Sequence, residues 1–173
     1  MRITINLGGS TFNKEELDTE FLKKAARSIK KLHESDHDVL IVTGGGQTSR
    51  KFIKAAKKLG ASDDEMDRLG VHATRLNAKL LISALGDLAE SEPCETYKEA
   101  SETMLEGKIP VMGGTKPGHT TDAVAAELAS TTDSDILVYF TDVDGVYTAD
   151  PKKDETATKI KQMTTEELSE LMS

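Results

Sequence analysis

Residues 108–128, KIPVMGGTKPGHTTDAVAAEL, decide the fold class of this chain. The apolar run 109–112 predicts a buried strand, and the pair Gly113–Gly114 lets backbone N–H groups approach a ligand closely. Thr120 or Thr121 can cap the helix that follows. A helix N-terminus has unpaired N–H groups and a partial positive charge, so the stretch predicts an anion site between a strand and a helix.

Asp122 lies in the first turn of this predicted helix. A carboxylate beside a phosphate site repels the phosphate, unless the carboxylate meets a metal ion or orients cationic groups. The alternative is that Asp122 only complements the helix dipole. The stretch by itself supports the two interpretations equally.

The composition limits the class of protein. The chain has 173 residues, 37% of them hydrophobic and 30% charged, which suits one domain with a sizeable core. No apolar run approaches a membrane span, and the first residues lack the apolar region of a signal peptide, so we expect a cytoplasmic protein without a membrane partner. The net charge of −8 argues against nucleic-acid binding. An anionic ligand would be held by loop amides, helix ends, a few basic side chains and a divalent cation.

Apolar strands and amphipathic helices alternate along the chain. We predict strands at residues 2–7, 39–43, 109–112 and 136–140, and helices at about 19–32, 47–59, 62–81, 96–105 and 122–128, with a last one capped by Thr164 and Glu167. This α/β pattern indicates a mostly parallel sheet between two layers of helices, with ligands beyond the carboxyl ends of the strands.

Two of the predicted helices have apolar stripes that we expect to be buried. The stripe of the first comprises Phe52, Ile53, Ala56 and Leu59, and that of the second, which begins at a Ser62–Glu65 capping box, comprises Met66, Leu69, Ala73, Leu76, Leu80 and Leu81.

The loops at the strand ends carry the candidate chemistry. They are residues 8–10, 44–46, 113–114 and 141–145. Arg50 lies one helical turn beyond the glycine triplet 44–46 and can fork onto phosphate oxygens, although such triplets also occur as plain turns. In the acidic stretch 141–151, Tyr147 can offer its ring to a base, and Asp150 can accept from a ribose or base.

Several common motifs are excluded. Residues 113–120 approach a Walker A loop but have His119 in place of its lysine, and no Gly-x-Gly-x-x-Gly follows the first strand. The acidic stretch lacks the EF-hand spacing. The histidines have no metal-binding spacing, and the single cysteine, Cys94, excludes an internal disulfide.

Taken together, the motifs resemble the archaeal-type UMP kinases (uridylate kinases) of the amino acid kinase superfamily. The resemblance covers essentially the whole chain and rests on ordered motifs: INLGGS at 5–10, VTGGGQTSRKFI at 42–53, DRLGVHATRLNA at 67–78, PVMGGTKPGHTTDAVAA at 110–126 and TDVDGVYTADPKKD at 141–154. It implies a three-layer αβα sandwich that transfers the γ-phosphoryl group of ATP, bound with Mg²⁺, to UMP. It also implies self-association, usually as a hexamer of dimers.

The resemblance further implies roles for individual residues. The UMP phosphate would be held by Gly44, Gly45 and Arg50, its ribose by Asp67, and its uridine side by Met112, Gly114, Thr115, Pro117, Gly118, His119, Thr120 and Thr121. ATP would be bound by Thr141, Asp142, Val146, Tyr147 and Asp150, with Gly9 and Ser10 near the transferred phosphoryl group. Asp122 would organise cationic groups at the reaction centre, and Mg²⁺ would be held mainly through the ATP phosphates. Arg75 and Asn77 also match the family pattern, for ligand binding, packing or subunit contacts.

The chain departs from the superfamily pattern in two places. Many members have a phosphate-contacting lysine in the first strand where this chain has Asn6, and Lys152 or Lys159 could supply positive charge instead. The chain ends at Ser173, where relatives continue, so we expect it to lack the usual C-terminal segment. We expect one kinase domain over 1–173, with an acceptor-side lobe at about 1–130 and the start of an ATP-side lobe at about 131–173.

Two other functions remain open at this point. One is a kinase of the same fold with another acceptor, such as carbamate, an amino acid or isopentenyl phosphate. The other is a non-catalytic protein that binds nucleotides or oxyanions.

Overall fold

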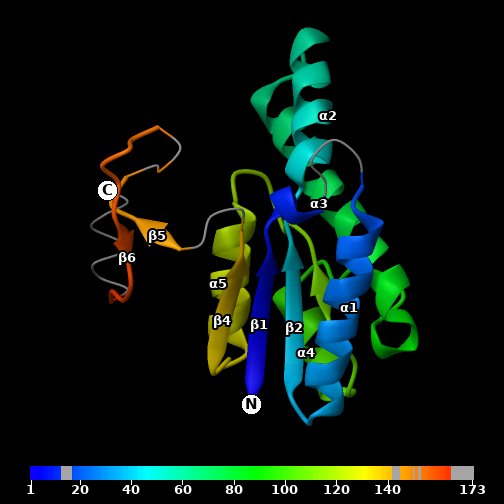
Figure 1. Cartoon of the computed structure of the whole chain (residues 1–173). Coiled ribbons are helices and arrows are strands. Elements are labelled where there is room, and N and C mark those ends of the chain that lie inside the picture. Colours follow the sequence, from blue (N-terminus) through cyan, green and yellow to red (C-terminus); the bar gives the residue numbers. More distant parts are fainter. Residues whose placement is uncertain (13–16, 142–144, 150, 152, 165–173) are drawn as a thin grey trace. The chain divides into compact units, whose positions relative to one another are not determined.

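The chain forms a parallel sheet with helices on both faces (Figure 1). The computed structural model describes residues 1–12, 17–141, 145–149, 151 and 153–164, and it divides into two compact units, 1–141 and 142–173. In the first unit the strands are β1 (Arg2–Leu7), β2 (Asp38–Thr43), β3 (Val111–Met112) and β4 (Ile136–Phe140). The sheet has the order β3-β2-β1-β4, and every neighbouring pair is parallel, as predicted.

The helices follow the predicted ranges closely. They are α1 (Thr19–Glu34), α2 (Gly46–Lys58), α3 (Asp63–Leu85), α4 (Tyr97–Leu105) and α5 (Thr121–Thr131), with 3-10 turns η1 (Gly9–Thr11) and η2 (Gly86–Leu88). The second unit contains the antiparallel pair β5 (Val146–Tyr147) and β6 (Lys159–Ile160). The helix predicted after Thr164 lies outside the described residues, and the lobe boundary expected near residue 130 stays a prediction.

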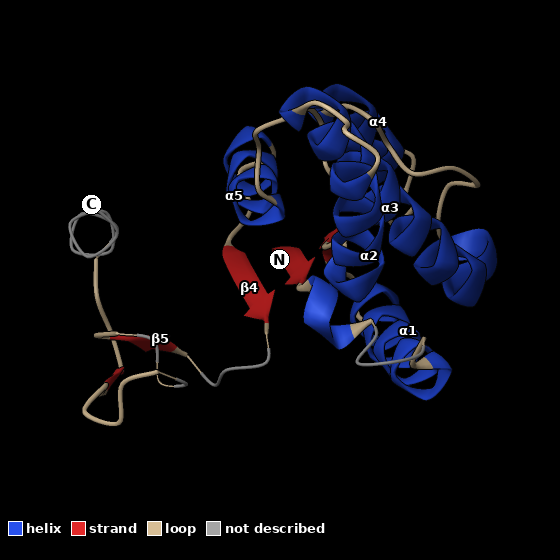
Figure 2. Cartoon of the chain, turned by 90° about the horizontal axis from the view of Figure 1, so that it is seen from above, coloured by secondary structure: helices blue, strands red, loops and turns tan. Residues whose placement is uncertain are grey.

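Two hydrophobic clusters make the three layers. On one face, Ile3, Ile5 and Leu7 of β1 pack with α1 and α3. On the other face, Leu40 and Val42 of β2 pack with α4 and α5. Since successive side chains of a strand point to opposite faces, one strand serves both layers. Figure 2 shows α1 and α5 on opposite sides of the sheet, so the predicted αβα sandwich is confirmed.

Side-chain caps fix where the helices begin. The Asp18 carboxylate accepts from the backbone N–H of Phe21 at 2.8 Å. Ser62 and Glu65 form the predicted capping box at the start of α3. Thr120 caps α5, because its side chain accepts from the N–H of Ala123. Each cap satisfies an N–H group that the helix itself leaves unpaired.

β3 is shorter than the run of apolar residues predicted. Ile109 makes only an isolated bridge to Ala89, and the strand comprises just Val111 and Met112. Pro110 explains the difference: it has no N–H to donate to a sheet, although its carbonyl accepts from Ile41.

The apolar stripe predicted for α2 is largely exposed. Phe52 is 55% exposed, Leu59 just after the helix is 87% exposed, and Ala56 is the buried residue of α2. In the stripe of α3, Leu76 is likewise 55% exposed. The reason is the position of the helix: α2 packs on α3 beyond the carboxyl ends of the strands and not on the sheet (Figure 1). Helical spacing therefore predicted the helix correctly but not what its apolar face meets.

β4, the strand predicted at 136–140, is partly exposed. Ile136, Tyr139 and Phe140 are exposed, because β4 is at the edge of the sheet and pairs with β1 alone in the described part of the first unit. Among the described residues, no helix is both long and apolar enough to cross a bilayer.

The core makes a clear stability prediction. Leu81 of α3 is fully buried, so Leu81→Ala should lower the free energy of unfolding by about 2–5 kcal/mol through lost burial and a cavity. Leu105 at the end of α4 is 77% exposed, and Leu105→Ala should change it by less than about 0.5 kcal/mol. Urea denaturation of both variants measures the difference. Equal losses would contradict the described packing.

Candidate functional site

Three loops meet where the parallel strands end. They follow β1, β2 and β3, whose carboxyl ends lie at one edge of the sheet. The first two touch through their backbones: a Cβ on Gly9 would lie 2.0 Å from the nitrogen of Gly46, and one on Gly44 would lie 2.3 Å from the nitrogen of Gly9. No real side chain tolerates such distances, so glycine is required at both positions. Three of the four strand-end loops named from the sequence, 8–10, 44–46 and 113–114, therefore lie at this edge of the sheet. In the fourth loop, residues 142–144 lie outside the described residues.

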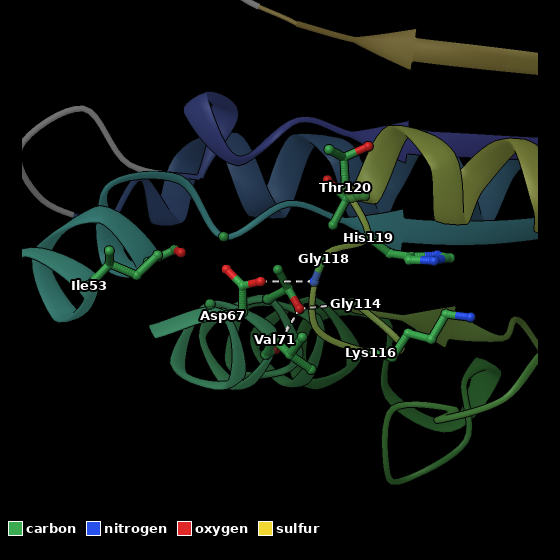
Figure 3. A pocket seen from close by; sticks show the side chains of 13 residues that line it. Ile53, Asp67, Val71, Gly114, Lys116, Gly118, His119 and Thr120 are labelled. Atoms are coloured by element: carbon green, nitrogen blue, oxygen red, sulfur yellow. Dashed lines mark hydrogen bonds between the residues drawn. The ribbon is translucent and has the colours of Figure 1, made fainter. Parts of the chain in front are cut away.

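A cavity of about 380 Å³ opens beside these loops (Figure 3). Its walls come from the start of α2, one face of α3, the loop after β3 and the start of α5. The lining residues are Gly45, Ser49, Ile53, Asp67, Gly70, Val71, Thr74, Gly114, Lys116, Gly118, His119, Thr120 and Thr121. Its volume falls within the usual range for small-ligand sites.

α3 holds the floor of the cavity through two buried side chains. The Thr74 hydroxyl accepts from the N–H of Gly114 at 2.6 Å and donates to the carbonyl of Val71. The Asn77 amide donates to the carbonyls of Gly44 at 2.7 Å and Gly45 at 3.2 Å. One helix therefore fixes the glycine loops of two different strands by pairing backbone groups of those loops, among them the N–H of Gly114 and the carbonyl of Gly44.

Asp67 and Arg75 of α3 hold the rest of the loop after β3. The Asp67 carboxylate accepts from the N–H of Gly118 at 2.9 Å, a contact drawn in Figure 3. Gly118 has φ +78°, a conformation that favours glycine. Arg75 donates to the carbonyl of Gly114 at 3.2 Å and pairs with Glu95 at 2.8 Å. In this structure, Arg75 and Asn77 thus contact the loops of the site, one of the alternatives left open by the sequence.

The start of α2 provides an anion-binding element. Its N-cap is Gly45, which has no side chain to satisfy the first N–H groups of the helix. Gly45 and Ser49 line the cavity, so the positive end of the helix dipole lies at the cavity wall. α5 differs, because Thr120 already caps it.

Asp122, in the first turn of α5, does not line the cavity. It lies near the carboxyl end of β1, where the chain order of the strands changes direction in the sheet. Its carboxylate accepts from the Asn6 amide of β1 at 2.6 Å, and its carbonyl accepts from the Tyr139 hydroxyl of β4 at 3.2 Å. Burial, and secondarily the charge of Asp122, raise the pKa of Tyr139 above its usual value, so this phenol stays protonated and able to donate at neutral pH. Ligands of parallel α/β sheets commonly bind at such a reversal, here between β2 and β4 on either side of β1.

Comparison with known proteins identifies the family. The sequence model of the amino acid kinase family matches residues 1–173. The chain belongs to the amino acid kinase family.

Several proteins similar to this chain are named uridylate kinase. It is 48% identical over 172 residues to a uridylate kinase of Methanocaldococcus jannaschii and 47% identical over 171 residues to one of Thermococcus gammatolerans. Each alignment covers 99% of this chain and 76% of the relative. The crystal structure of uridylate kinase from Archaeoglobus fulgidus superposes with a TM-score of 0.90 at 41% identity, covering 99% of this chain and 78% of that one.

Most acceptor-side residues that the family pattern implied are brought together. The cavity is lined by Gly45, Asp67, Gly114, Gly118, His119, Thr120 and Thr121. Gly44 lies beneath it, held by Asn77. Thr115 and Pro117 belong to the same loop but do not line the cavity.

Met112 and Arg50 are placed differently from the expectation. Met112 is fully buried in the core with α4 and α5, because its side chain points to the layer of helices beneath the sheet and not to the strand end. Arg50 is exposed and donates to the Gln47 side chain of the same helix at 3.4 Å, so it does not line the cavity. Their roles in ligand binding stay predictions.

The sequence reasoning missed several lining residues of this amino acid kinase. These are Ser49, Ile53, Gly70, Val71 and Thr74, whereas the lining residue Lys116 lies within the stretch 112–121 that the resemblance assigned to the uridine side. A signal for three of them existed: Gly70, Val71 and Thr74 follow Asp67 at helical spacing, so they share one face of α3 with it.

The residues implied for ATP are only partly described. Gly9 and Ser10 form η1 after β1, and Thr141 follows β4. Val146 and Tyr147 make β5 of the second unit, where they pair with Ile160 and Lys159. Asp142, Asp150 and Lys152 lie outside the described residues.

The Thr74 contact can be tested without a ligand. Thr74→Val leaves the buried N–H of Gly114 without its acceptor, which should lower the free energy of unfolding by about 1–3 kcal/mol and speed hydrogen exchange at Gly114. The control is Thr103→Val, because the buried Thr103 hydroxyl contacts only the weakly polar Cys94 thiol, at 3.6 Å, among the contacts described for it. Urea denaturation and amide exchange by NMR measure both. Unchanged exchange at Gly114 would contradict the role of Thr74.

Proposed function

We propose that this chain is a UMP kinase, which transfers the γ-phosphoryl group of ATP to UMP and releases UDP and ADP. The observation that carries the proposal is the cavity of about 380 Å³, in which a helix N-terminus and the Asp67 carboxylate face one space. An acceptor with a phosphate and a ribose needs such a pair of elements. Relatives named uridylate kinase, 47–48% identical over 99% of the chain, support the same acceptor.

Each part of UMP has a proposed partner. The phosphate lies at the start of α2, near Gly45 and Ser49, and Arg50 reaches it after leaving Gln47. Asp67 accepts from a ribose hydroxyl. The uracil lies along the loop 112–121, which includes the lining residues Gly114, Gly118, His119, Thr120 and Thr121. Met112, Thr115 and Pro117 belong to the same stretch, and Gly44 precedes Gly45 on the phosphate side.

The chemistry needs positioning more than covalent help. An oxygen of the UMP phosphate attacks the γ-phosphorus of ATP, and the bond from that phosphorus to the bridging oxygen breaks, so ADP leaves with the bond electrons. The attacking oxygen is ionised near neutral pH, and no general base is required. Asp122 organises the cationic groups at the centre, and the backbone of Gly9 and Ser10 lies near the transferred group.

The donor side of the proposal rests mainly on the family. ATP is bound by Thr141, Val146 and Tyr147 together with Asp142 and Asp150. Mg²⁺ accompanies ATP, and it commonly binds through substrate phosphates and one or two carboxylates, which fits the exposed carboxylate of Asp122. When bound, the ion neutralises charge on the phosphate oxygens. Among the described residues, no group of three or more His, Cys, Asp and Glu could hold a metal ion.

We also propose that the protein works in the cytoplasm as a homo-oligomer, a hexamer of dimers in the family pattern. The exposed apolar side chains of Phe52, Leu59 and Leu76 on α2 and α3 support self-association.

The first test is an assay of this chain for ADP release from ATP and Mg²⁺ with different acceptors. UMP should give the highest kcat/KM, and product analysis should identify UDP. CMP, carbamate, an amino acid and isopentenyl phosphate are the competing acceptors. A faster reaction with any of the last three would assign another acceptor class, and nucleotide binding by calorimetry without any product would show a non-catalytic protein.

Asp67→Asn tests the acceptor site. Loss of the carboxylate weakens both the bond to Gly118 and the contact with the ribose, so the KM for UMP should rise about tenfold to a hundredfold while kcat changes little. Asp64→Asn is the matched control on the same helix, because Asp64 pairs with Arg68 outside the cavity. Steady-state kinetics at saturating ATP measures both. A similar KM for the two variants would place the ribose elsewhere.

A further inference from the structure

We propose that Asn6 is a positioning residue for phosphoryl transfer: its amide holds the Asp122 carboxylate in one orientation at the reaction centre. The inference rests on the proposed kinase function. Asn6 stands where many superfamily members have a lysine, so this chain would orient the aspartate with a neutral donor and not with a cation.

The amide comes from an inner strand of the sheet. β1 is hydrogen-bonded on both sides, and Asn6 lies in register between Val42 of β2 and Tyr139 of β4. Its side chain is 1% exposed and points to the face covered by α5. The Asn6 nitrogen lies 2.6 Å from an Asp122 carboxylate oxygen. The sheet therefore fixes the position of the Asn6 amide, which donates to the Asp122 carboxylate.

Asp122 needs such a partner because it is exposed. A solvated aspartate in the first turn of a helix can occupy more than one rotamer. Any rotamer that leaves Asn6 also leaves a buried N–H group unpaired, which is unfavourable. The Asn6 bond therefore selects one rotamer, while the Tyr139 hydroxyl holds the backbone carbonyl of Asp122 from the neighbouring strand.

Asn6 contributes less to the stability of the fold than an apolar residue would at this buried position. Its side-chain oxygen is buried and has no hydrogen-bond partner among the described residues. A half-paired amide in a core is less favourable than an apolar side chain of similar size. Positions that break the packing rules in this way are the ones where function is expected.

This reasoning predicts opposite effects of one substitution. Asn6→Leu should keep or raise the urea midpoint of unfolding, yet it should lower kcat about tenfold to a hundredfold with the KM for UMP within twofold of wild type. A purely structural Asn6 would lower stability and kcat together. The control is Thr4→Val, because Thr4 is fully buried on the same face of β1 but pairs with Ser134 and not with Asp122. Thr4→Val should leave kcat unchanged.

A conservative variant separates the donated hydrogen bond from side-chain size. The carboxyl group introduced by Asn6→Asp can donate to Asp122 only when it is protonated. The ratio of variant kcat to wild-type kcat should therefore rise as the pH is lowered and fall as the pH is raised. Dividing by the wild-type kcat cancels the pH dependence that arises from ionisation of UMP, ATP and Tyr139. Tyr139 is the titratable side chain that β4 places next to Asp122. A ratio that is constant with pH would contradict the proposal.

An NMR measurement keeps this inference separate from the proposed function. Side-chain couplings should show one χ1 rotamer of Asp122 in the wild type and averaging over several in Asn6→Leu. Absence of UDP formation by the wild type would refute the kinase function alone. A single, unchanged rotamer in Asn6→Leu, or a kcat equal to that of the wild type, would overturn the role of Asn6.

Discussion

The loops at the strand ends have backbone groups that lack partners in the regular backbone pairing of strands and helices. Side chains of α3 supply the missing hydrogen bonds. Glycine loops can bind an anion only if their amides stay exposed and fixed, and such loops have no side chains of their own for this. Thr74 and Asn77, three residues apart on α3, hold the loops after β3 and β2. Thr43 at the end of β2 donates to the carbonyl of Thr74 at 2.9 Å, which ties the helix back to the sheet. The shape of the cavity therefore depends on how α3 is seated.

The sequence predicted the secondary structure and its layers well, because they follow from local chemistry. Caps such as Asp18 and Ser62, strand runs and the turns after them are all encoded within a few residues. What failed was the prediction of which apolar faces are covered. Phe52 and Leu76 have the spacing of core residues, yet they are exposed, because burial depends on elements that are distant in sequence. Pro110 shows a smaller failure, in which one missing N–H shortened a strand.

The candidate site was predictable where motifs mark it and hidden where partners come from afar. Glycine loops identified Gly45 and Gly114, whereas no local pattern indicated that the Thr74 hydroxyl would pair with an amide 40 residues later. Asp122 illustrates the limit. Its place in a helix start was evident from the sequence, but the stretch 108–128 by itself supported a dipole role and a catalytic role equally, and only the family resemblance favoured the catalytic one. Its contact with Asn6, 116 residues earlier, needed the sheet order to be known.

The cavity has a further consequence for how such an enzyme can change. All of its lining residues lie between Gly45 and Thr121, within the first unit. Strands β1 and β4, which hold Asp122, lie outside that interval. Substitutions in β1 or β4 that loosen the hold on Asp122 are thus distant along the chain from those that reshape the acceptor pocket, although Asp122 itself directly follows the lining residue Thr121. Acceptor preference can therefore change while both strands that hold Asp122 are left intact.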